Sequence, residues 1–432
     1  MFFGVGLAAI ALGALAVRVA FVTVVDPRVP RLGDASAYHL LAQNLAHGRG
    51  YIRPFDYQLL GRTRATAEYP PLFPGLLAAA TKVGAHSVES QRLFLSVVGA
   101  ISVVLIGLLG RRVAGPTAGL VAAALASVYP MLFLSEATLM SEALFVLLVT
   151  ATLLLAYRAI DSPTPVRFGA LGIVLGLATL TRAEGVLLAV VLVVPLCWRL
   201  RDLDALRRLV LGAITLGIAV VVVAPWTIRN AVRLDAFVPV STNAATLVDG
   251  ANCDLVYRGH ELGLWRATFA SSTASPRGQA EACFEGFDIR DPNFQEAKAA
   301  RSHLHDGLAY ARHHIAALPK VMTVRVLRTW GVFAPRQQVD FESLEGRPRR
   351  WQMAGTILYW ILAPFAVGGV VVLARRRVPV WPLVSTAVVV VISAALTYGQ
   401  QRFRVGAEPA ILVGAAVAFV ELVRAIRRPV LR

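Results

Sequence analysis

Two carboxylates lie near the ends of the first long polar stretch of the chain, Arg31–Gly75. Asp34 and Glu68 are both close to apolar sequence, and a carboxylate at a membrane boundary is costly unless it is solvated, paired or used. Structural roles are possible for both: Asp34 could cap a helix, and Glu68 precedes a Pro-Pro turn. A base at this boundary could deprotonate an acceptor hydroxyl, and Asp34 is our candidate for that role.

The other acidic residues near apolar runs also lie at the ends of those runs. Glu136, Glu142 and Glu184 fall at the expected external ends or loops, and no acidic residue lies at the middle of an expected span. A proton- or sodium-coupled transporter more often places ionisable groups near the bilayer midplane. This distribution favours chemistry at the outer membrane boundary.

Four arginines lie at the expected external helix ends, namely Arg182, Arg229, Arg402 and Arg404. The guanidinium fork suits phosphate recognition, although an interfacial arginine more often anchors a helix end. The sequence has no glycine-rich phosphate loop for a free nucleotide. We therefore expect an activated substrate in lipid form, a polyprenyl-phosphate sugar, whose departing phosphate these arginines would receive.

The composition shows what must position these residues. The 432-residue chain is 56% hydrophobic and only 16% charged, with a mean hydropathy of +0.63, which identifies an integral membrane protein. We predict an all-α polytopic protein of about ten spans. The apolar runs are 3–25, 92–110, 117–134, 141–157, 168–181, 184–198, 209–228, 354–374, 380–398 and 405–423.

Charge predicts the topology. The net charge of +17 comes largely from short arginine clusters between apolar runs, which is typical of cytoplasmic loops. The sequence has no continuous basic face, so nucleic-acid binding is excluded. With an uncleaved first span starting inside, the polar segments 26–91 and 229–352 lie outside. We divide the chain into a catalytic transmembrane module (1–228), an external segment (229–352) and C-terminal transmembrane helices (353–432).

The second external segment carries three further features. His313–Phe333 has the spacing of an amphipathic helix lying on the membrane surface. Cys253 and Cys283 could form a disulfide in an oxidising compartment, or stay unpaired. Histidines near residues 303–314 could bind a divalent ion, although their spacing is a weak signal without a companion ligand.

Six motifs together resemble a known family. They are GDASAYHLLAQNLAHGRGY, EYPPLFPGLLAAA, SEATLMSEALF, GLATLTRAEG, APWTIRNAVRLDAFVPVSTNAATLVDGAN and QQRFRVGAEPAIL, which run from residue 33 to residue 412. In this order they resemble the GT-C membrane glycosyltransferases that use polyprenyl-phosphate sugars. The bacterial group in question is related to protein O-mannosyltransferases and to the aminoarabinose transferase of lipid A.

The resemblance implies roles for individual residues. Asp34 matches the first-loop aspartate taken as the catalytic base. Glu142, or as the weaker match Glu136, falls where the family has a second acidic residue at the next external loop. Glu68 matches a position that in some relatives helps to hold a metal ion, so Glu68 is a candidate ligand of a possible divalent metal. Glu68 and the adjacent Tyr69 are also candidate substrate-binding residues, although several relatives have lysine where this chain has Tyr69, which weakens the expected phosphate contact there. Arg182 and the pair Arg402 and Arg404 match basic positions that could meet the lipid phosphate. The implied fold is a GT-C type helix bundle with interfacial helices in the first external loop.

This sequence also departs from the family pattern. Asp34 lacks an acidic neighbour, which weighs against a protein acceptor, and Tyr69 replaces the lysine of several relatives. The expected function is inverting transfer of a sugar to an extracytoplasmic envelope acceptor, a glycolipid, polysaccharide or protein, at the outer face of the cytoplasmic membrane. The sequence requires no cofactor, and a divalent metal ion is a possible one. The alternative is a lipid-linked sugar flippase or a small-solute transporter.

Overall fold

The computed structural model describes residues 2–26, 33–267, 282–284 and 290–427. Within these ranges every regular element is a helix, apart from one isolated antiparallel bridge between Ile52 and Ala65. The beginning of the Arg31–Gly75 stretch, parts of the second polar segment and the last five residues lie outside the described residues.

The helices form two groups. The long bundle contains α1 (Phe2–Ala20) with its π-helical extension (Phe21–Val25), α5 (Val88–Ala114), α6 (Pro116–Val128), α7 (Pro130–Ala137), α8 (Glu142–Asp161), α9 (Pro165–Thr181), α10 (Glu184–Arg199), α11 (Ala205–Leu234), α17 (Arg349–Arg375), α18 (Trp381–Leu396), η3 (Gln401–Ala407) and α19 (Glu408–Arg427). The second group contains α2 (Asp34–Ala46), α3 (Pro54–Leu60), α4 (Leu72–Lys82), α12 (Asn243–Gly250), α13 (Asp254–Tyr257), η2 (Gly259–Glu261), α14 (Glu296–His313), α15 (Leu318–Thr329) and α16 (Pro335–Ser343).

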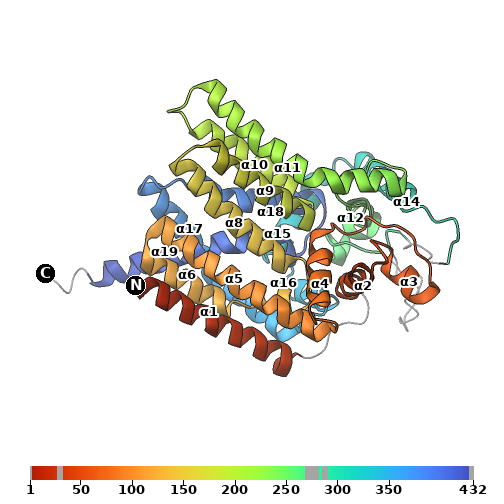
Figure 1. The fold of residues 1–432 in the computed structure, drawn as a ribbon, viewed down its shortest axis with the longest axis horizontal. Helices are drawn as coiled ribbons and strands as arrows, with labels where there is room; N and C mark the ends of the chain where they lie inside the picture. Colours follow the sequence, from red (N-terminus) through yellow and green to blue (C-terminus); the bar gives the residue numbers. More distant parts are fainter. Residues whose placement is uncertain (1, 27–32, 268–281, 285–289, 428–432) are drawn as a thin grey trace.

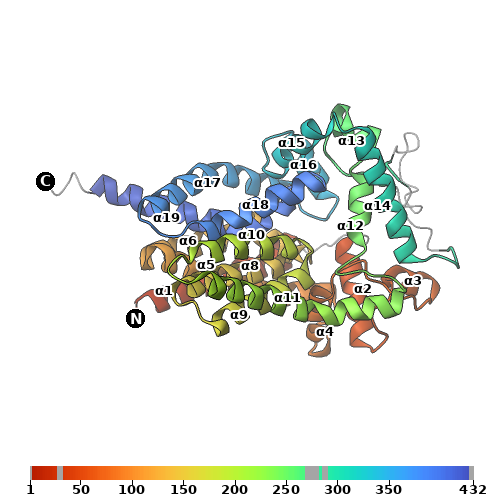
Figure 2. The same ribbon diagram turned by 90° about the horizontal axis from the view of Figure 1, so that it is seen from above.

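The second group gathers at one end of the bundle, which we call the polar end. Figures 1 and 2 show α2, α3, α4, α12 and α14 together at this end, while both chain termini lie at the opposite end. The two long polar segments of the sequence therefore share one end of the molecule. Their shared location is what allows residues from both segments to build one site.

The described residues contain fewer clear spans than the ten expected. Six helices are long and apolar enough to cross a membrane, or seven if α6 and α7 count as one span bent by 48°. The bend falls at Pro130, which has no N–H to continue the helical hydrogen bonds. The runs predicted at 168–181, 184–198 and 380–398 are helices of 17, 16 and 16 residues, about 24–26 Å long and shorter than a hydrocarbon core of about 30 Å.

Close helix contacts at glycine hold the bundle together. At the crossing of α17 and α19, a Cβ added to Gly369 would lie 1.8 Å from the carbonyl oxygen of Gly414. At the crossing of α5 and α6, a Cβ on Gly119 would lie 2.5 Å from the carbonyl oxygen of Gly107. Such approaches strengthen packing in lipid, where association relies on van der Waals contact rather than on the hydrophobic effect.

The expected surface helix over His313–Phe333 is corrected by the structure. The helix in this region is α15, and its basic residues Arg325 and Arg328 are buried. Arg328 Nε donates to the carbonyl of Leu262 at 2.6 Å, and Arg325 Nη2 donates to Asn252 Oδ1 at 3.1 Å. These guanidiniums satisfy backbone and amide oxygens inside the polar end, so they do not form a basic face for a membrane surface.

A disulfide closes part of the second polar segment. Cys253 and Cys283 are bonded, with their Cα atoms 5.4 Å apart. The structure therefore selects the paired alternative of the two that the sequence left open. The bond joins the start of α13 to residues 282–284 across a sequence separation of 30.

Candidate active site

Asp34 is the first residue of α2, directly after Gly33, whose φ of +97° favours glycine. The N-cap residue of α2 is Gly33, and no side chain caps this helix. The carboxylate of Asp34 therefore does not serve as a helix cap. Instead Oδ1 accepts a hydrogen bond from the Tyr69 hydroxyl at 2.9 Å, and Oδ2 accepts one from Arg402 Nη1 at 3.1 Å. The Asp34 side chain keeps 25% of its surface exposed, which leaves it accessible to a substrate.

Aromatic packing fixes Tyr69, one of the two residues that hold Asp34 in place. Tyr38, one turn along α2, contacts the Tyr69 ring at 4.8 Å and the Phe73 ring of α4 at 4.9 Å between centroids. Burial, and next the charge of Asp34, raise the pKa of Tyr69 well above its usual value. Tyr69 therefore stays protonated at neutral pH and acts as a donor to Asp34.

Arg402, on η3, connects three carboxylates from different parts of the chain. Besides Asp34, its Nη1 lies 3.6 Å from Glu345 Oε2, and its Nε lies 3.7 Å from Glu142 Oε1. Its backbone N–H donates to Glu342 Oε1 at 2.9 Å. The Arg402 side chain is only 10% exposed, so these charges meet largely out of bulk water.

Glu142 and Arg182 form a second ion pair beside the first. Arg182 Nη1 lies 2.9 Å from Glu142 Oε1, and Arg182 Nη2 lies 2.9 Å from Glu184 Oε1. Glu142 is 1% exposed, and a carboxylate buried to this degree needs such partners. Arg182 occupies the break between α9 and α10, where the chain leaves helical geometry and its side chain can reach α8.

Several of these groups line one cavity of about 230 Å³, whereas Glu142 and Glu345 lie behind its lining. Its polar wall comprises Asp34, Tyr69, Arg182, Glu184 and Arg402, and its remaining walls include Leu187, Leu247 and Leu396. An apolar groove lined by Val149 of α8, Leu188 of α10 and Val389 of α18 shares Glu184, Ser393 and Phe403 with this cavity. The groove itself has a volume of only about 10 Å³, so it extends the cavity as an apolar surface rather than as a formed channel.

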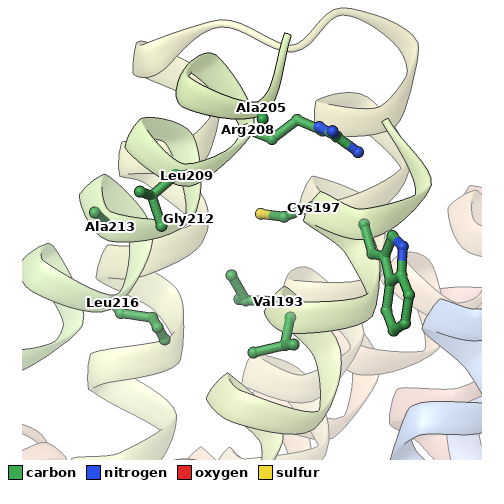
Figure 3. Close-up of a pocket in the computed structure, with 10 residues that line it drawn as sticks. Val193, Cys197, Ala205, Arg208, Leu209, Gly212, Ala213 and Leu216 are labelled. Atoms are coloured by element: carbon green, nitrogen blue, oxygen red, sulfur yellow. The ribbon is translucent and has the colours of Figure 1, made fainter. Parts of the chain in front are cut away.

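A second hollow, shown in Figure 3, has a different character. It lies between the end of α10 and the beginning of α11 and has a volume of about 460 Å³. It is lined by apolar residues such as Val193 and Leu216, together with Cys197 and Arg208. It contains no carboxylate or histidine, and it lies about 20 Å along α10 from Glu184. We assign the chemistry to the cavity that contains Asp34.

Two of the arginines proposed from the sequence do not line this cavity. Arg404 is fully buried, with Nε 2.7 Å from Glu408 Oε1 and its guanidinium 3.5 Å from the Tyr359 ring centroid. Arg229 donates through Nη1 to the carbonyl of Thr66 at 2.6 Å and through Nη2 to that of Tyr51 at 2.7 Å. Arg404 thus stabilises the start of α19, and Arg229 attaches the first polar segment to α11.

Glu68 is half-buried beside the cavity. Burial is the largest cause that raises the pKa of Glu68 to about 7, and the charges of Glu296, Asp34 and Asp56 act in the same direction while Arg53 opposes them. Among the described residues, no group of three or more His, Cys, Asp or Glu side chains is placed to hold a metal ion. Glu68 therefore has no set of companion ligands there, and we derive no chemical step through a metal.

The sequence analysis missed Glu345. This residue lies in the turn between α16 and α17, and its side chain is 26% exposed. Burial raises the pKa of Glu345, the charge of Asp34 adds to this shift, and Arg402 opposes it. The local sequence SLEGRPRR gives no signal for the site, because an acidic residue in a polar turn is ordinarily a solvated charge.

One protein-family description matches part of the sequence. Residues 68–228 match the dolichyl-phosphate-mannose-protein mannosyltransferase family. Over this segment, which is less than half of the chain, the protein is similar to that family. The match confirms the resemblance that the motifs predicted, and it includes Glu68, Tyr69, Glu142 and Arg182. No curated protein matches the sequence.

Solved structures share the fold. ArnT from Cupriavidus metallidurans in the apo state is 14% identical, with a TM-score of 0.56 over 96% of this chain and 59% of ArnT. The apo oligosaccharyltransferase from Archaeoglobus fulgidus is 15% identical, with a TM-score of 0.54 over 99% of this chain and 52% of that protein. A third structure, Archaeoglobus fulgidus AglB in complex with an inhibitory peptide and a dolichol-phosphate, is 14% identical, with a TM-score of 0.52 over 99% of this chain and 52% of AglB.

These similarities confirm a GT-C type fold in a multi-pass membrane protein. The chain spans between half and three fifths of the length of the solved structures that it matches.

Proposed function

We propose that this chain is a glycosyltransferase that moves a sugar from a polyprenyl-phosphate donor to an envelope acceptor, with Asp34 as the general base. The single observation that carries the proposal is the arrangement of Asp34, Arg182 and Arg402 around one cavity that continues into an apolar groove. A base and cationic groups in one cleft are what transfer from a lipid phosphate requires.

The chemistry follows from these positions. Asp34 accepts the proton of the acceptor hydroxyl as the acceptor oxygen bonds to the anomeric carbon of the sugar. The bond between that carbon and the phosphate oxygen breaks, and the phosphate leaves with the electron pair. Arg182 and Arg402 stabilise the charge that develops on the phosphate. A single displacement of this kind inverts the configuration of the anomeric carbon.

In this proposal Glu142 positions the two arginines and does not act as a base. It is 1% exposed and contacts Arg182 and Arg402, so it orients the two guanidiniums rather than meeting the acceptor. Tyr69 orients Asp34 through its hydroxyl. The apolar surface between α8, α10 and α18 is the proposed path of the polyprenyl chain, which would lie against it after a small separation of these helices. AglB, whose structure was solved with a dolichol-phosphate, has a similar fold.

The membrane arrangement completes the proposal. The helices α9, α10 and α18 join the clear spans to give about ten membrane-crossing helices, with tilt or local thinning of the bilayer compensating for their length. The arginine clusters between the spans support an orientation in which the polar end faces the outside of the cytoplasmic membrane. The acceptor is a glycolipid, a polysaccharide or, less compatibly with the isolated Asp34, a protein.

The decisive experiment measures sugar release from radiolabelled polyprenyl-phosphate mannose, glucose and arabinose by the purified full-length chain. We compare wild type with Asp34→Asn and with Asp202→Asn, which removes an exposed carboxylate between α10 and α11. The Asp34→Asn variant should lose about 10²–10⁴-fold in turnover, the usual contribution of a positioned base. The Asp202→Asn variant should keep wild-type turnover.

Full turnover by folded Asp34→Asn protein contradicts the assigned base. If folded wild-type protein releases sugar from no donor but moves polyprenyl-phosphate sugars across reconstituted vesicles, the chain is a carrier instead.

A further inference from the structure

A second polar cavity lies at the polar end, outside the candidate active site. It has a volume of about 390 Å³ and lies between the first polar segment, the end of α11 and the beginning of α14. Figures 1 and 2 show α3, α14 and the end of α11 together in this region. Five cationic side chains line the cavity, namely Arg53, Arg64, Arg233, Lys298 and Arg301.

The charge of this cavity is unbalanced. Its lining contains two carboxylates, Asp235 and Glu296. Among the residues that the structure describes, the exposed side chains of Arg233, Lys298 and Arg301 form no ion pair. Three cations without protein partners around one hollow create a positive potential that attracts an anion.

The floor of the cavity is rigid because Glu296 is fully engaged. Its Oε2 lies 3.1 Å from Arg53 Nη1 and accepts from Thr66 Oγ1 at 2.6 Å. Its Oε1 accepts from the backbone N–H of Ala67 at 2.8 Å and from Thr242 Oγ1 at 2.9 Å. The contacts of Glu296 are thus made with Arg53, Thr66, Ala67 and Thr242, which leaves its carboxylate no oxygen without a partner for the three exposed cations.

The neighbouring surface of α11 is apolar and faces outward. Val221, Pro225, Ile228 and Val232 are all exposed, and at 100° per residue they fall within about 60° of each other around the helix. α11 is one of the helices long and apolar enough to cross a membrane. The stripe ends one residue before Arg233, about 1.5 Å along the helix axis and about 100° around it. The headgroup of a lipid lying along the stripe would therefore reach the cavity by extending around the end of α11.

We propose that this cavity binds the phosphate headgroup of an anionic membrane lipid, whose acyl chains lie along the apolar stripe of α11. Arginine and lysine at a membrane surface each add a favourable interaction with anionic headgroups, and the arginine fork matches phosphate oxygens. The inference is independent of the transferase activity, since none of the three exposed cations lines the cavity of Asp34.

The test measures lipid binding by native mass spectrometry of the full-length protein in detergent. The probe is phosphatidylglycerol, compared with diacylglycerol, which has no phosphate, and with sn-glycero-3-phosphoglycerol, which has no acyl chains. The cavity variant replaces Arg233, Lys298 and Arg301 with glutamine. Its matched control replaces the exposed Arg258, Arg312 and Lys320 of the same segment with glutamine, and so removes the same charge elsewhere.

We expect the cavity variant to bind phosphatidylglycerol at least about tenfold more weakly than wild type, while the control variant binds as wild type does. Diacylglycerol and the chain-free headgroup should bind weakly to all three proteins. Equal losses in both variants, or a loss in neither, overturn the proposal. Equally tight binding of the chain-free headgroup overturns the assignment to a membrane lipid. Single glutamine variants of the three cations, each weakening binding about two- to fivefold, provide the same test if the triple variant does not fold.

Discussion

Replacing Arg402 with glutamine tests how the charges of the candidate active site are coupled. Arg402 Nη1 lies 3.1 Å from Asp34 Oδ2 and 3.6 Å from Glu345 Oε2. Because both oxygens lie close to one nitrogen, they are at most about 7 Å apart, where two carboxylates at an effective dielectric constant of about 20 repel by about 2.4 kcal/mol. In the variant this repulsion is no longer offset by the guanidinium, while Glu142 keeps Arg182 as its partner.

A repulsion of this size corresponds to about 1.7 pH units of proton affinity. The pair of carboxylates should therefore hold a proton to higher pH, and the acid limb of kcat/KM against pH should move upward by about 1 to 2 units. The assay is the initial rate of sugar release between pH 5 and 9. Arg402→Lys is the matched control, because it keeps the charge but loses the fork, so KM should rise while the acid limb stays near that of wild type. An unchanged acid limb in folded Arg402→Gln protein refutes the coupling.

Two further predictions concern stability. Glu68→Gln should raise the free energy of unfolding by about 2 kcal/mol at pH 8 and change it little at pH 4. The reason is that the pKa of Glu68 is raised from 4.5 to about 7, so this carboxyl destabilises the folded protein as the pH rises through that interval. Equal thermal stabilisation at both pH values in calorimetry would contradict this cause. Replacing Cys253 and Cys283 with serine should lower the stability of the second polar segment by about 2–4 kcal/mol, seen as faster proteolysis within residues 229–352, and cleavage at the wild-type rate would refute this.

The sequence predicted the helices well because each apolar run imposes helical hydrogen bonding in lipid. It could not predict how many of them are full spans, since the 16 residues of α18 satisfy hydropathy but not length. It also misassigned Arg325 and Arg328. Their helical spacing looks amphipathic, but the carbonyls of Ala251 and Leu262 that receive them lie more than 60 residues away in sequence.

Local sequence predicted some of the residues of the candidate active site. Asp34, Tyr69, Arg182 and Arg402 carry polar chemistry beside apolar runs, and the structure places all four around one cavity. The sequence alone could not show that Arg402 lines the cavity while Arg404 does not. In the 3₁₀ geometry of η3 each residue turns by about 120°, so two residues apart the side chains point to different sides.

The ion pair between Arg18 and Glu136 has a consequence for how the chain enters the membrane. Arg18 of α1 is buried, with Nε 2.6 Å from Glu136 Oε2 of α7, and Gly99 leaves the room for that carboxylate, since a Cβ there would lie 2.1 Å from it. The two partners are 118 residues apart in sequence, so at about 5–20 residues per second the ribosome needs about 6–24 s to supply the second after the first. The ion pair therefore cannot form until α7 has been synthesised. In the folded bundle, α1 is held in part by a charge contact with a helix that is made later in the chain.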